Sequence, residues 1–378
     1  MRDAHQYRAV PLRHQFALLV LVLLCVRIQG GALNDGIKTI AGMVGFEEAQ
    51  PPRDAHQPWV QQVGKHPKTY IFHNFLTDEE RVHMLTLAAP EMKRSTVVGG
   101  AGAGVVDDIR TSYGMFIQRL HDPIIERIEN RVSLFTQLPV SHQEDIQVLR
   151  YQAGQKYGAH YDSSYADKGP GPKWRMATFL IYLSDVEEGG ETAFPQGSEW
   201  EDPSIPARLE AAGVQFSDCA KGHVAAKPKA GDATLFYSYH PNGTMDTASM
   251  HTGCPVIKGI KWAAPIWIHV DEFNPPLTRP AKQSMAASNP GVCEDLDDRC
   301  AGWAASGECT ANPGFMVGAN TSSLGMCRLA CKVCQPCDSD DWECINSNRR
   351  KGGFLELNKE EMEWLGVKWL GREPSPEL

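Results

Sequence analysis

The sequence lacks an excess of basic residues, since 37 lysines and arginines stand against 46 aspartates and glutamates and give a net charge of -9. Proteins that bind nucleic acid usually carry a basic face that neutralises phosphate. We therefore expect no nucleic-acid partner. The chain also lacks an internal repeat, and its 378 residues are enough for one large domain and a smaller one.

The N-terminal region lacks an apolar run long enough to span a bilayer comfortably. Residues 16–26, FALLVLVLLCV, follow Arg2, Arg8 and Arg13 and precede a stretch of small residues. This pattern fits the apolar region of a secretory signal. We interpret residues 1–30 as a signal peptide or a short signal anchor, and we expect membrane contact only if the segment stays uncleaved. Either form delivers the chain to the lumen of the endoplasmic reticulum or Golgi.

Cysteine, in contrast, is abundant. Eight of the eleven cysteines lie between positions 293 and 344, as expected of a disulfide module in an oxidising compartment. Cys219 and Cys254 are the only cysteines in the region between the apolar run and that module. We predict that they form a disulfide worth roughly 3 kcal/mol, two buried free thiols being the alternative. Asn242 and Asn320 each begin a glycosylation sequon.

The order of apolar patterns predicts an α+β fold. Residues 77–89 begin with Thr77 and Glu80, a capping-box signature, and a second helix is expected from Asp122 and Pro123. Short runs of branched and aromatic residues then predict strands at 146–151, 176–183, 233–237 and 264–270. Helices followed by strands favour a β-sandwich or jelly roll with supporting helices. The segment 273–292, rich in Pro, Ser and Ala, is interpreted as a linker.

A metal site is predicted from His160 and Asp162, which would share one face of a strand. His251 can complete the site, because a jelly roll brings distant strands together at its open end. Two histidines and one carboxylate are typical of non-haem Fe(II) oxygenases, with zinc as the rival metal. Lys261 could anchor the distal carboxylate of 2-oxoglutarate, which favours iron.

Four motifs in this region resemble the plant and green-algal prolyl 4-hydroxylases. They are RTSYGMFI at 110–117, HYD at 160–162, the run RMATFLIYLSDVEEGGETAFP at 175–195 and SMHTGCPVIKGIKWA at 249–263. The resemblance covers residues 67–272. It implies a double-stranded β-helix, dependence on Fe(II), 2-oxoglutarate, O2 and L-ascorbate, and peptidyl proline as the substrate.

The resemblance also implies roles for individual residues. It makes His160, Asp162 and His251 the iron ligands, and Lys261 the 2-oxoglutarate anchor with Tyr151 and Thr178 as hydrogen-bonding partners. The residues implied for the peptide groove are Arg110, Tyr157, Arg175, Trp267 and His269. Core packing is the alternative for Tyr151. Trp267 and His269 share one face of their strand, which is either the groove or the core.

The cysteine module at 293–334 has six cysteines, for which counting alone allows fifteen pairings and the C-x3-C-x2-C spacing leaves zinc as an alternative. It resembles the ShK toxin-like (ShKT) domain. That resemblance selects the pairs Cys293–Cys334, Cys300–Cys327 and Cys309–Cys331. Cys337 and Cys344 lie in the remaining tail, 335–378, and can pair with each other. The ShKT partner is unknown.

The leading hypothesis is an enzyme that converts proline in proline-rich secretory proteins to 4-hydroxyproline. Retention of the carboxylate at Asp162 favours hydroxylation over halogenation. One alternative is a related oxygenase acting on lysyl or small-molecule substrates. Another is a secreted ShKT binding protein with a degenerate oxygenase scaffold, against which the intact set of His160, Asp162, His251 and Lys261 argues.

Overall fold

The computed structural model describes the chain from residue 57 to residue 362 with several gaps. The described ranges are 57–95, 97–98, 104–105, 109–163, 174–197, 199–273, 290–318, 324–338, 340–358 and 361–362. The expected signal segment, most of the expected linker and Asn320 lie outside these residues. Among the helices described, none combines the length and the apolar character that crossing a membrane requires.

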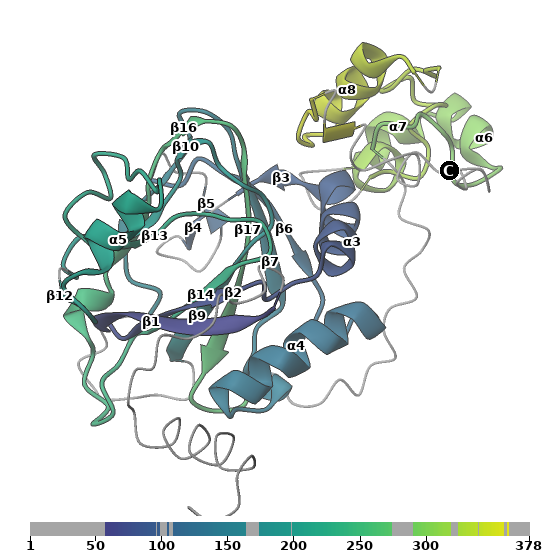
Figure 1. The fold of residues 1–378 in the computed structure, drawn as a ribbon. Coiled ribbons are helices and arrows are strands. Elements are labelled where there is room, and N and C mark those ends of the chain that lie inside the picture. The colour runs from purple at the N-terminus through teal and green to yellow at the C-terminus, as the bar shows by residue number, and fades with distance from the viewer. Residues whose placement is uncertain are drawn as a thin grey trace, which may run out of the picture. The chain divides into compact units, whose positions relative to one another are not determined.

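The fold is built around a nine-stranded antiparallel sheet (Figure 1). In spatial order its strands are β12 (Glu199–Trp200), β1 (Trp59–His66), β2 (Thr69–His73), β14 (Ala233–Tyr237), β9 (Arg175–Tyr182), β17 (Lys261–His269), β7 (Ile146–Tyr151), β6 (Tyr113–Ile117) and β3 (Lys93–Arg94). Strands β7 and β17 are buried on both faces, which explains the long apolar run in β17, whereas the two polar residues of β7, Gln147 and Arg150, are buried with hydrogen-bond partners.

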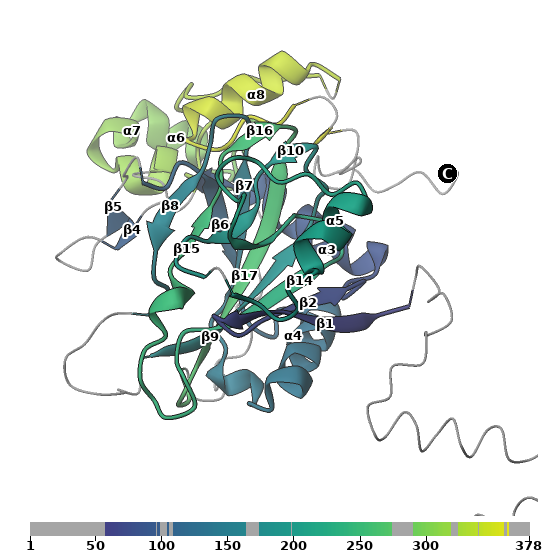
Figure 2. The ribbon, with the colours of Figure 1, turned by 60° about the vertical axis from the view of Figure 1, so that its left-hand side comes forward.

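A smaller antiparallel sheet carries two of the predicted metal ligands. Its strands in spatial order are β13 (Val224–Ala226), β11 (Thr192–Phe194), β15 (His251–Gly253) and β8 (Tyr157–His160). Figure 2 shows β8 and β15 side by side, and their register sets His251 directly opposite His160. Two further strand pairs are β10 (Glu188–Gly189) with β16 (Val256–Lys258) and β4 (Val97–Val98) with β5 (Gly104–Val105). The two larger sheets confirm the jelly-roll fold.

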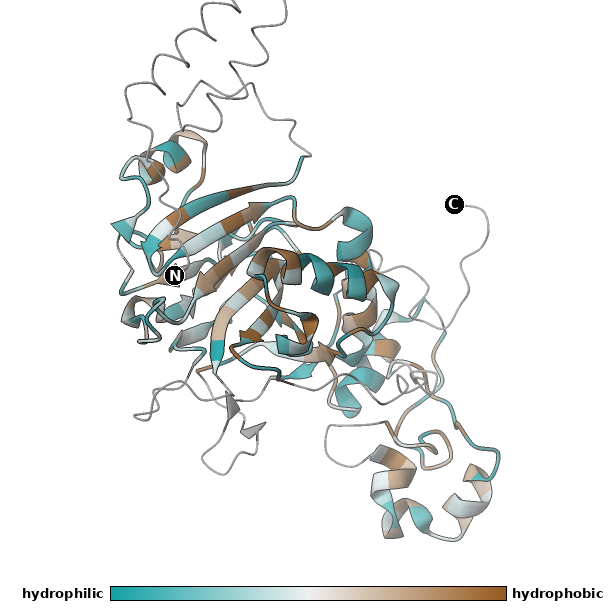
Figure 3. Ribbon diagram, turned by 90° about the horizontal axis from the view of Figure 1, so that it is seen from below, coloured by the Kyte–Doolittle hydropathy of each residue, from teal (hydrophilic) through white to brown (hydrophobic). Residues whose placement is uncertain are grey.

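Helices α3 (Asp78–Ala88) and α4 (Pro123–Thr136) pack against the main sheet (Figure 1). The predicted capping box is present, since Thr77 Oγ1 accepts from the Glu80 amide and Glu80 accepts from the Thr77 amide. Asp122 caps α4 by accepting from two amides of its first turn. Figure 3 shows hydrophobic and hydrophilic residues alternating along the helices, as expected of elements with one buried face.

The predicted strands are confirmed, with small shifts at their ends. β7 and β14 have the expected bounds, β9 begins and ends one residue earlier than expected, and β17 begins at Lys261 rather than at residue 264. The predicted order of elements is wrong, because β1 and β2 precede the first helix described. The sheet therefore begins at Trp59, ahead of residue 67. The apolar residues of β1 do not alternate regularly, so its sequence carries little strand signal.

The mid-chain disulfide between Cys219 and Cys254 is present. Cys254 follows β15 directly and Cys219 lies ahead of β13. The bond therefore links the chain next to β15 with the chain next to β13, the two strands that flank β11 in the smaller sheet. The loop that it closes spans a sequence separation of 35. Because Cys254 is three positions from His251, the bond also restrains the strand that carries this histidine.

The C-terminal region contains the three pairings implied by the resemblance and a fourth one, Cys337–Cys344. Its helices are α6 (Cys300–Ala305), α7 (Glu308–Ala311) and α8 (Trp342–Lys351), and the chain also contains a short helix, α5 (Ile205–Ala211), ahead of β13. From Pro58 onward, the described residues form one compact unit by their contacts. The segment after α8 is part of that unit's core, since Leu355, Leu357 and Met362 are buried with strands of the main sheet.

Candidate metal and cosubstrate site

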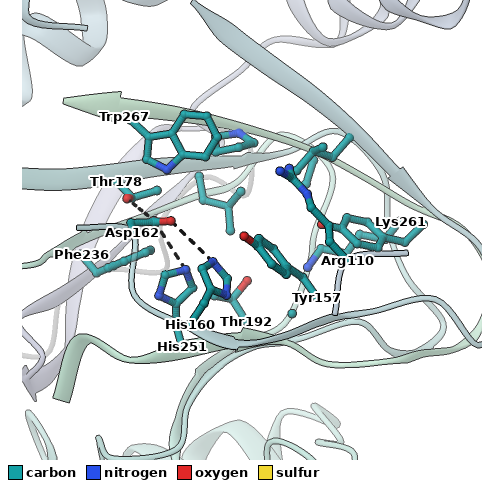
Figure 4. A pocket seen from close by; sticks show the side chains of 16 residues that line it. Arg110, Tyr157, His160, Asp162, Thr178, Thr192, Phe236, His251, Lys261 and Trp267 are labelled. Carbon is teal, nitrogen blue, oxygen red and sulfur yellow. Dashed lines mark hydrogen bonds and ion pairs between the residues drawn. The ribbon is translucent and has the colours of Figure 1, made fainter. Parts of the chain in front are cut away.

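A pocket lies where the two sheets face each other, and it collects most of the predicted site residues (Figure 4). Strand β17 contributes every second residue from Lys261 to Trp267, as expected for one face of a strand. Strands β8 and β15 contribute the two histidines. The remaining lining residues are Arg110, Leu149, Tyr151, Tyr157, Asp162, Thr178, Leu180, Thr192, Phe236 and Gly253.

His160, Asp162 and His251 form a compact three-ligand cluster. Their donor atoms all lie within 4.8 Å of one another. His160 Nε2 is 3.5 Å from Asp162 Oδ1, and His251 Nε2 is 3.5 Å from Asp162 Oδ2. Figure 4 shows both imidazole rings facing the carboxylate. One cation could therefore contact all three groups.

Each of the three predicted metal ligands is oriented by a hydrogen bond to a residue outside the cluster. The Nδ1 atoms of His160 and His251 lie 2.8 and 3.0 Å from the carbonyl oxygens of Gly158 and Ser249. A carbonyl only accepts, so each Nδ1 carries the proton and each Nε2 lone pair is left for a metal. Thr178 Oγ1 donates to Asp162 Oδ2 at 2.5 Å, which fixes the carboxylate. The donor set and its orientation fit a divalent metal.

The charges at the cluster also suit a cation. Burial lowers the pKa of His251 to about 4, so its imidazole is neutral at pH 7. Burial favours the neutral form of Asp162, but His251 and His160 outweigh it and hold the pKa of this carboxyl well below its usual range. The cluster is thus an ionised carboxylate beside neutral imidazole, the protonation state that metal coordination requires.

Lys261 lies at the other end of the pocket, away from the two histidines (Figure 4). It is only 4% exposed, and burial lowers its pKa to about 8. Its Nζ is 5.8 Å from the centroid of the Tyr151 ring and 5.7 Å from that of Tyr182. Within the part of the chain that the structure describes, no carboxylate forms an ion pair with it. The Glu191 carboxylate raises the pKa of Lys261 against this burial but forms no ion pair with it, so the ammonium group can still pair with the carboxylate end of a cosubstrate.

A second cluster of possible ligands, His66, His240 and Asp246, lies outside this pocket. His240 Nε2 is 3.9 Å from Asp246 Oδ1, and that oxygen already accepts from the Ala248 amide. Lys65 and Lys68 line the same cleft, and their charge disfavours a cation there. Of the two clusters found among the described residues, the one formed by His160, Asp162 and His251 is the better metal site.

Two of the residues that line the pocket have buried donors without acceptors. Arg110 donates to Gln147 and lies over the Tyr157 ring, with its guanidinium carbon 4.8 Å from the ring centroid. Arg110 Nε and Trp267 Nε1 have no hydrogen-bond partner among the residues described. Buried N–H groups are rarely left unpaired in folded proteins. These two are placed to donate to a ligand that brings carbonyl oxygens.

Arg175 and His269 have a different placement from the other predicted groove residues, because they do not line the pocket. Arg175 Nε and His269 Nε2 contact the Glu144 carboxylate at 2.6 and 2.8 Å. Burial opposes ionisation of Glu144, but these two contacts hold its pKa below the usual range. The Arg175 guanidinium also stacks on Trp267, 3.8 Å from the ring centroid. Glu144 thereby links both residues to the wall of the pocket.

Glu144 and Thr192 are site residues that no sequence pattern indicated. Thr192 lines the pocket, and its Oγ1 accepts from the Tyr182 hydroxyl at 3.0 Å, so its own hydroxyl hydrogen is left for a ligand. Thr178, expected to bind the cosubstrate, instead has its hydroxyl hydrogen committed to Asp162. No local pattern distinguishes the two threonines, because their roles depend on partners from other strands.

The model of the 2OG-Fe(II) oxygenase superfamily matches residues 146–269. Probable prolyl 4-hydroxylase 4 and prolyl 4-hydroxylase 2 of Arabidopsis thaliana are 45% and 42% identical to this chain, over 73% of its length and 88% of theirs. A solved structure of a viral collagen prolyl hydroxylase from Paramecium Bursaria Chlorella virus-1 is 25% identical with a TM-score of 0.39, covering 54% of this chain and 96% of that one.

Proposed function

Because the chain belongs to the prolyl 4-hydroxylase family of 2OG-Fe(II) oxygenases, we propose that it hydroxylates proline residues in proline-rich peptides. The observation that carries this proposal is the placement of the ligand cluster, the unpaired Lys261 ammonium and the unpaired donors of Arg110 and Trp267 around one pocket. A metal, a dicarboxylate cosubstrate and a peptide each find matching groups there.

The ligands proposed for Fe(II) are His160, Asp162 and His251. Fe(II) together with 2-oxoglutarate and O2 would supply the oxidation of the proline C–H bond, with release of succinate and CO2. The chain's own part is to hold both imidazole Nε2 atoms and the carboxylate in place, through the carbonyls behind each ring and through Thr178. The motif resemblance supports L-ascorbate as the reductant, and loss of repeated turnover without ascorbate would test that role.

The distal carboxylate of 2-oxoglutarate is assigned to Lys261. The Lys261 ammonium group lies near two buried tyrosine rings. Because water does not screen the charge there, a hydrogen bond between this group and a carboxylate is stronger than at the surface. Thr192 is proposed as the second donor in place of Thr178, since its hydroxyl hydrogen is available. Tyr151 lies beside them in the same pocket and has a pKa raised by burial, so its phenol stays protonated and can donate.

Tyr157 and Trp267 are proposed to hold the reacting proline. Tyr157 stacks on His160 with ring centroids 3.7 Å apart, which brings an aromatic wall directly against the metal ligands. Trp267 is 6% exposed and is fixed from behind by Arg175. Two rigid rings can position a pyrrolidine ring and exclude water from the metal. Glu144 and His269 support this wall by holding Arg175 in place.

A polyproline II chain is the proposed form of the substrate. Its backbone carbonyls are free and its conformation is already ordered, so it suits a site with aromatic walls and unpaired donors. We expect proline-rich peptides containing Ser and Pro to be hydroxylated at least about tenfold more efficiently than free proline, and kcat/KM to rise with peptide length. Steady-state kinetics on a length series would measure this, with Gly-x-Pro repeats as the comparison series. Equal turnover of free proline or lysyl peptides would contradict it.

The secretory pathway, in the endoplasmic reticulum or Golgi lumen, is the proposed location. Five disulfides in the described region support an oxidising compartment. We further propose that residues 293–334 are an ShKT domain, which the three expected disulfide pairings support. Its proposed role is to bind a partner outside the catalytic pocket.

The Cys219–Cys254 bond provides a test of both stability and compartment. Replacing both cysteines with serine should lower the free energy of unfolding by about 3 to 4 kcal/mol, because the unfolded chain gains the freedom of the opened loop. The melting temperature should fall by about 10 °C in differential scanning calorimetry. Alkylation and peptide mapping of the natively purified protein should find neither thiol free. Recovery of either cysteine in alkylated form would refute the bond and weaken the lumenal assignment.

A further inference from the structure

The segment that follows α8, described at residues 354–358 and 361–362, is tied to the oxygenase core at several points. The Leu355 amide donates to the Met92 carbonyl at 2.8 Å, and Phe354 forms a β-bridge with Lys93 of β3. Arg349, at the end of α8, donates to the carbonyls of Ala89 and Leu355 at 2.9 and 2.6 Å. The segment therefore extends the edge of the main sheet.

Glu361 lies near the end of this segment and is buried against two strands of the main sheet. Its carboxylate accepts two hydrogen bonds from Arg150 of β7, at 2.6 and 2.8 Å, and one from Trp262 Nε1 of β17, at 3.2 Å. The side chains of Arg150 and Glu361 are 3% and 6% exposed. Asn358 and Glu361 exchange reciprocal hydrogen bonds, which fix the carboxylate within its own segment. One carboxylate thus bridges two neighbouring strands.

The bridge lies directly behind the cosubstrate end of the pocket. In the register of β7 and β17, Trp262 pairs with Arg150 and Lys261 pairs with Tyr151. Successive residues of a strand point to opposite faces. Lys261 and Tyr151 accordingly line the pocket, whereas Arg150 and Trp262 do not and point to the face that Glu361 covers.

We propose that Glu361 is a positioning residue for 2-oxoglutarate, acting through Arg150 and Trp262 on the strands that present Tyr151 and Lys261. The inference rests on the proposed function, because it takes Lys261 as the anchor of that cosubstrate. Loss of the carboxylate leaves the buried Arg150 charge without its counter-charge and with the Gln152 amide oxygen as its remaining side-chain acceptor, so the two strands must shift to hydrate or re-pair it. A small displacement there moves the Lys261 ammonium relative to the metal ligands.

Glu356 offers a matched control on the same segment. It also pairs with an arginine, Arg350, but both side chains are largely exposed and lie away from the pocket. Glu361→Gln and Glu356→Gln each replace a paired carboxylate with an amide of the same shape. Only the first change disturbs the buried bridge between β7 and β17.

Isothermal titration calorimetry of 2-oxoglutarate binding would test the proposal, using full-length protein with Mn(II) in place of Fe(II) and no peptide. We expect Glu361→Gln to raise the Kd for 2-oxoglutarate at least about fivefold and to leave the Kd for Mn(II) within about twofold. Glu356→Gln should change neither constant by more than about twofold. In turnover assays, Glu361→Gln should raise KM for 2-oxoglutarate while KM for the peptide stays unchanged.

A merely structural role for Glu361 makes a different prediction. Glu361→Gln would then lower the melting temperature while the folded protein bound 2-oxoglutarate as the wild type does, and this result would overturn the proposal. If Glu361→Gln does not fold, Arg150→Lys keeps the charge but loses the two-pronged contact. It should also weaken 2-oxoglutarate binding, and wild-type binding would again overturn the proposal.

The experiment also separates this inference from the proposed function. If the wild type binds 2-oxoglutarate but does not hydroxylate proline peptides, the substrate assignment fails and the positioning role stands. If the wild type does not bind 2-oxoglutarate at all, the Lys261 assignment fails and the positioning role fails with it.

Discussion

Replacing His251 with alanine is expected to lower kcat more than about 100-fold while the protein stays folded. Loss of a partner that merely orients a metal ligand typically costs about 10- to 100-fold, and here one of three protein ligands is itself removed. His160→Ala should behave alike, because each ring supplies one Nε2 to the cluster. Turnover of a proline-rich peptide and the bound Fe(II) content, measured together, would check both variants.

His240→Ala is the matched control for these two variants. It removes one histidine from the second cluster, which lies outside the pocket. The control should keep wild-type iron content and turnover. Full activity in His251→Ala, or a loss in His240→Ala as large as that in His251→Ala, would show that the wrong cluster has been assigned to iron.

Lys261→Ala is expected to raise the 2-oxoglutarate requirement at least about 100-fold. Removing one partner of a buried ion pair costs about 3 to 5 kcal/mol, and each 1.4 kcal/mol corresponds to a factor of about ten. Lys261 is the one lysine among the described residues that line the pocket, and the other cation there, Arg110, already donates to Gln147 and stacks on Tyr157. Steady-state KM for 2-oxoglutarate, at saturating peptide, is the measurement.

Lys258→Ala is the control for that prediction. Lys258 ends the neighbouring strand β16 and forms an exposed ion pair with Glu187, so its loss should leave KM within about twofold of the wild type. An unchanged KM in Lys261→Ala would mean that another group anchors the cosubstrate.

Elements with strong local signals were predictable from the sequence. Helices α3 and α4 have capping residues and apolar positions at helical spacing, and β7 and β14 are short runs rich in branched and aromatic residues. Strands β11, β13 and β15 have only three residues each. Such strands are defined by pairing with distant neighbours, so no local pattern predicts them.

The site residues also divide into those with a local sequence pattern and those whose role depends on distant partners. His160 and Asp162 were found because two ligands at i and i+2 form a local pattern. His251 followed from the expected jelly roll and Lys261 from the cation that 2-oxoglutarate requires, and the motif resemblance supported both. The Arg150–Glu361 pair joins residues 211 positions apart, and nothing near Glu361 in the sequence indicates its partner. The separation of Arg175 and His269 from the pocket likewise depends on Glu144, whose role only the folded arrangement reveals.

Mass spectrometry of a proline-rich peptide incubated with the protein, Fe(II), 2-oxoglutarate and O2 tests the central claim most directly. The account predicts that the peptide gains the mass of one oxygen atom at proline, that hydrolysis yields 4-hydroxyproline, and that one succinate forms for each hydroxylation. Succinate formation with an unmodified peptide, or oxygen placed on lysine rather than proline, would contradict the assignment of this chain as a peptidyl-prolyl 4-hydroxylase.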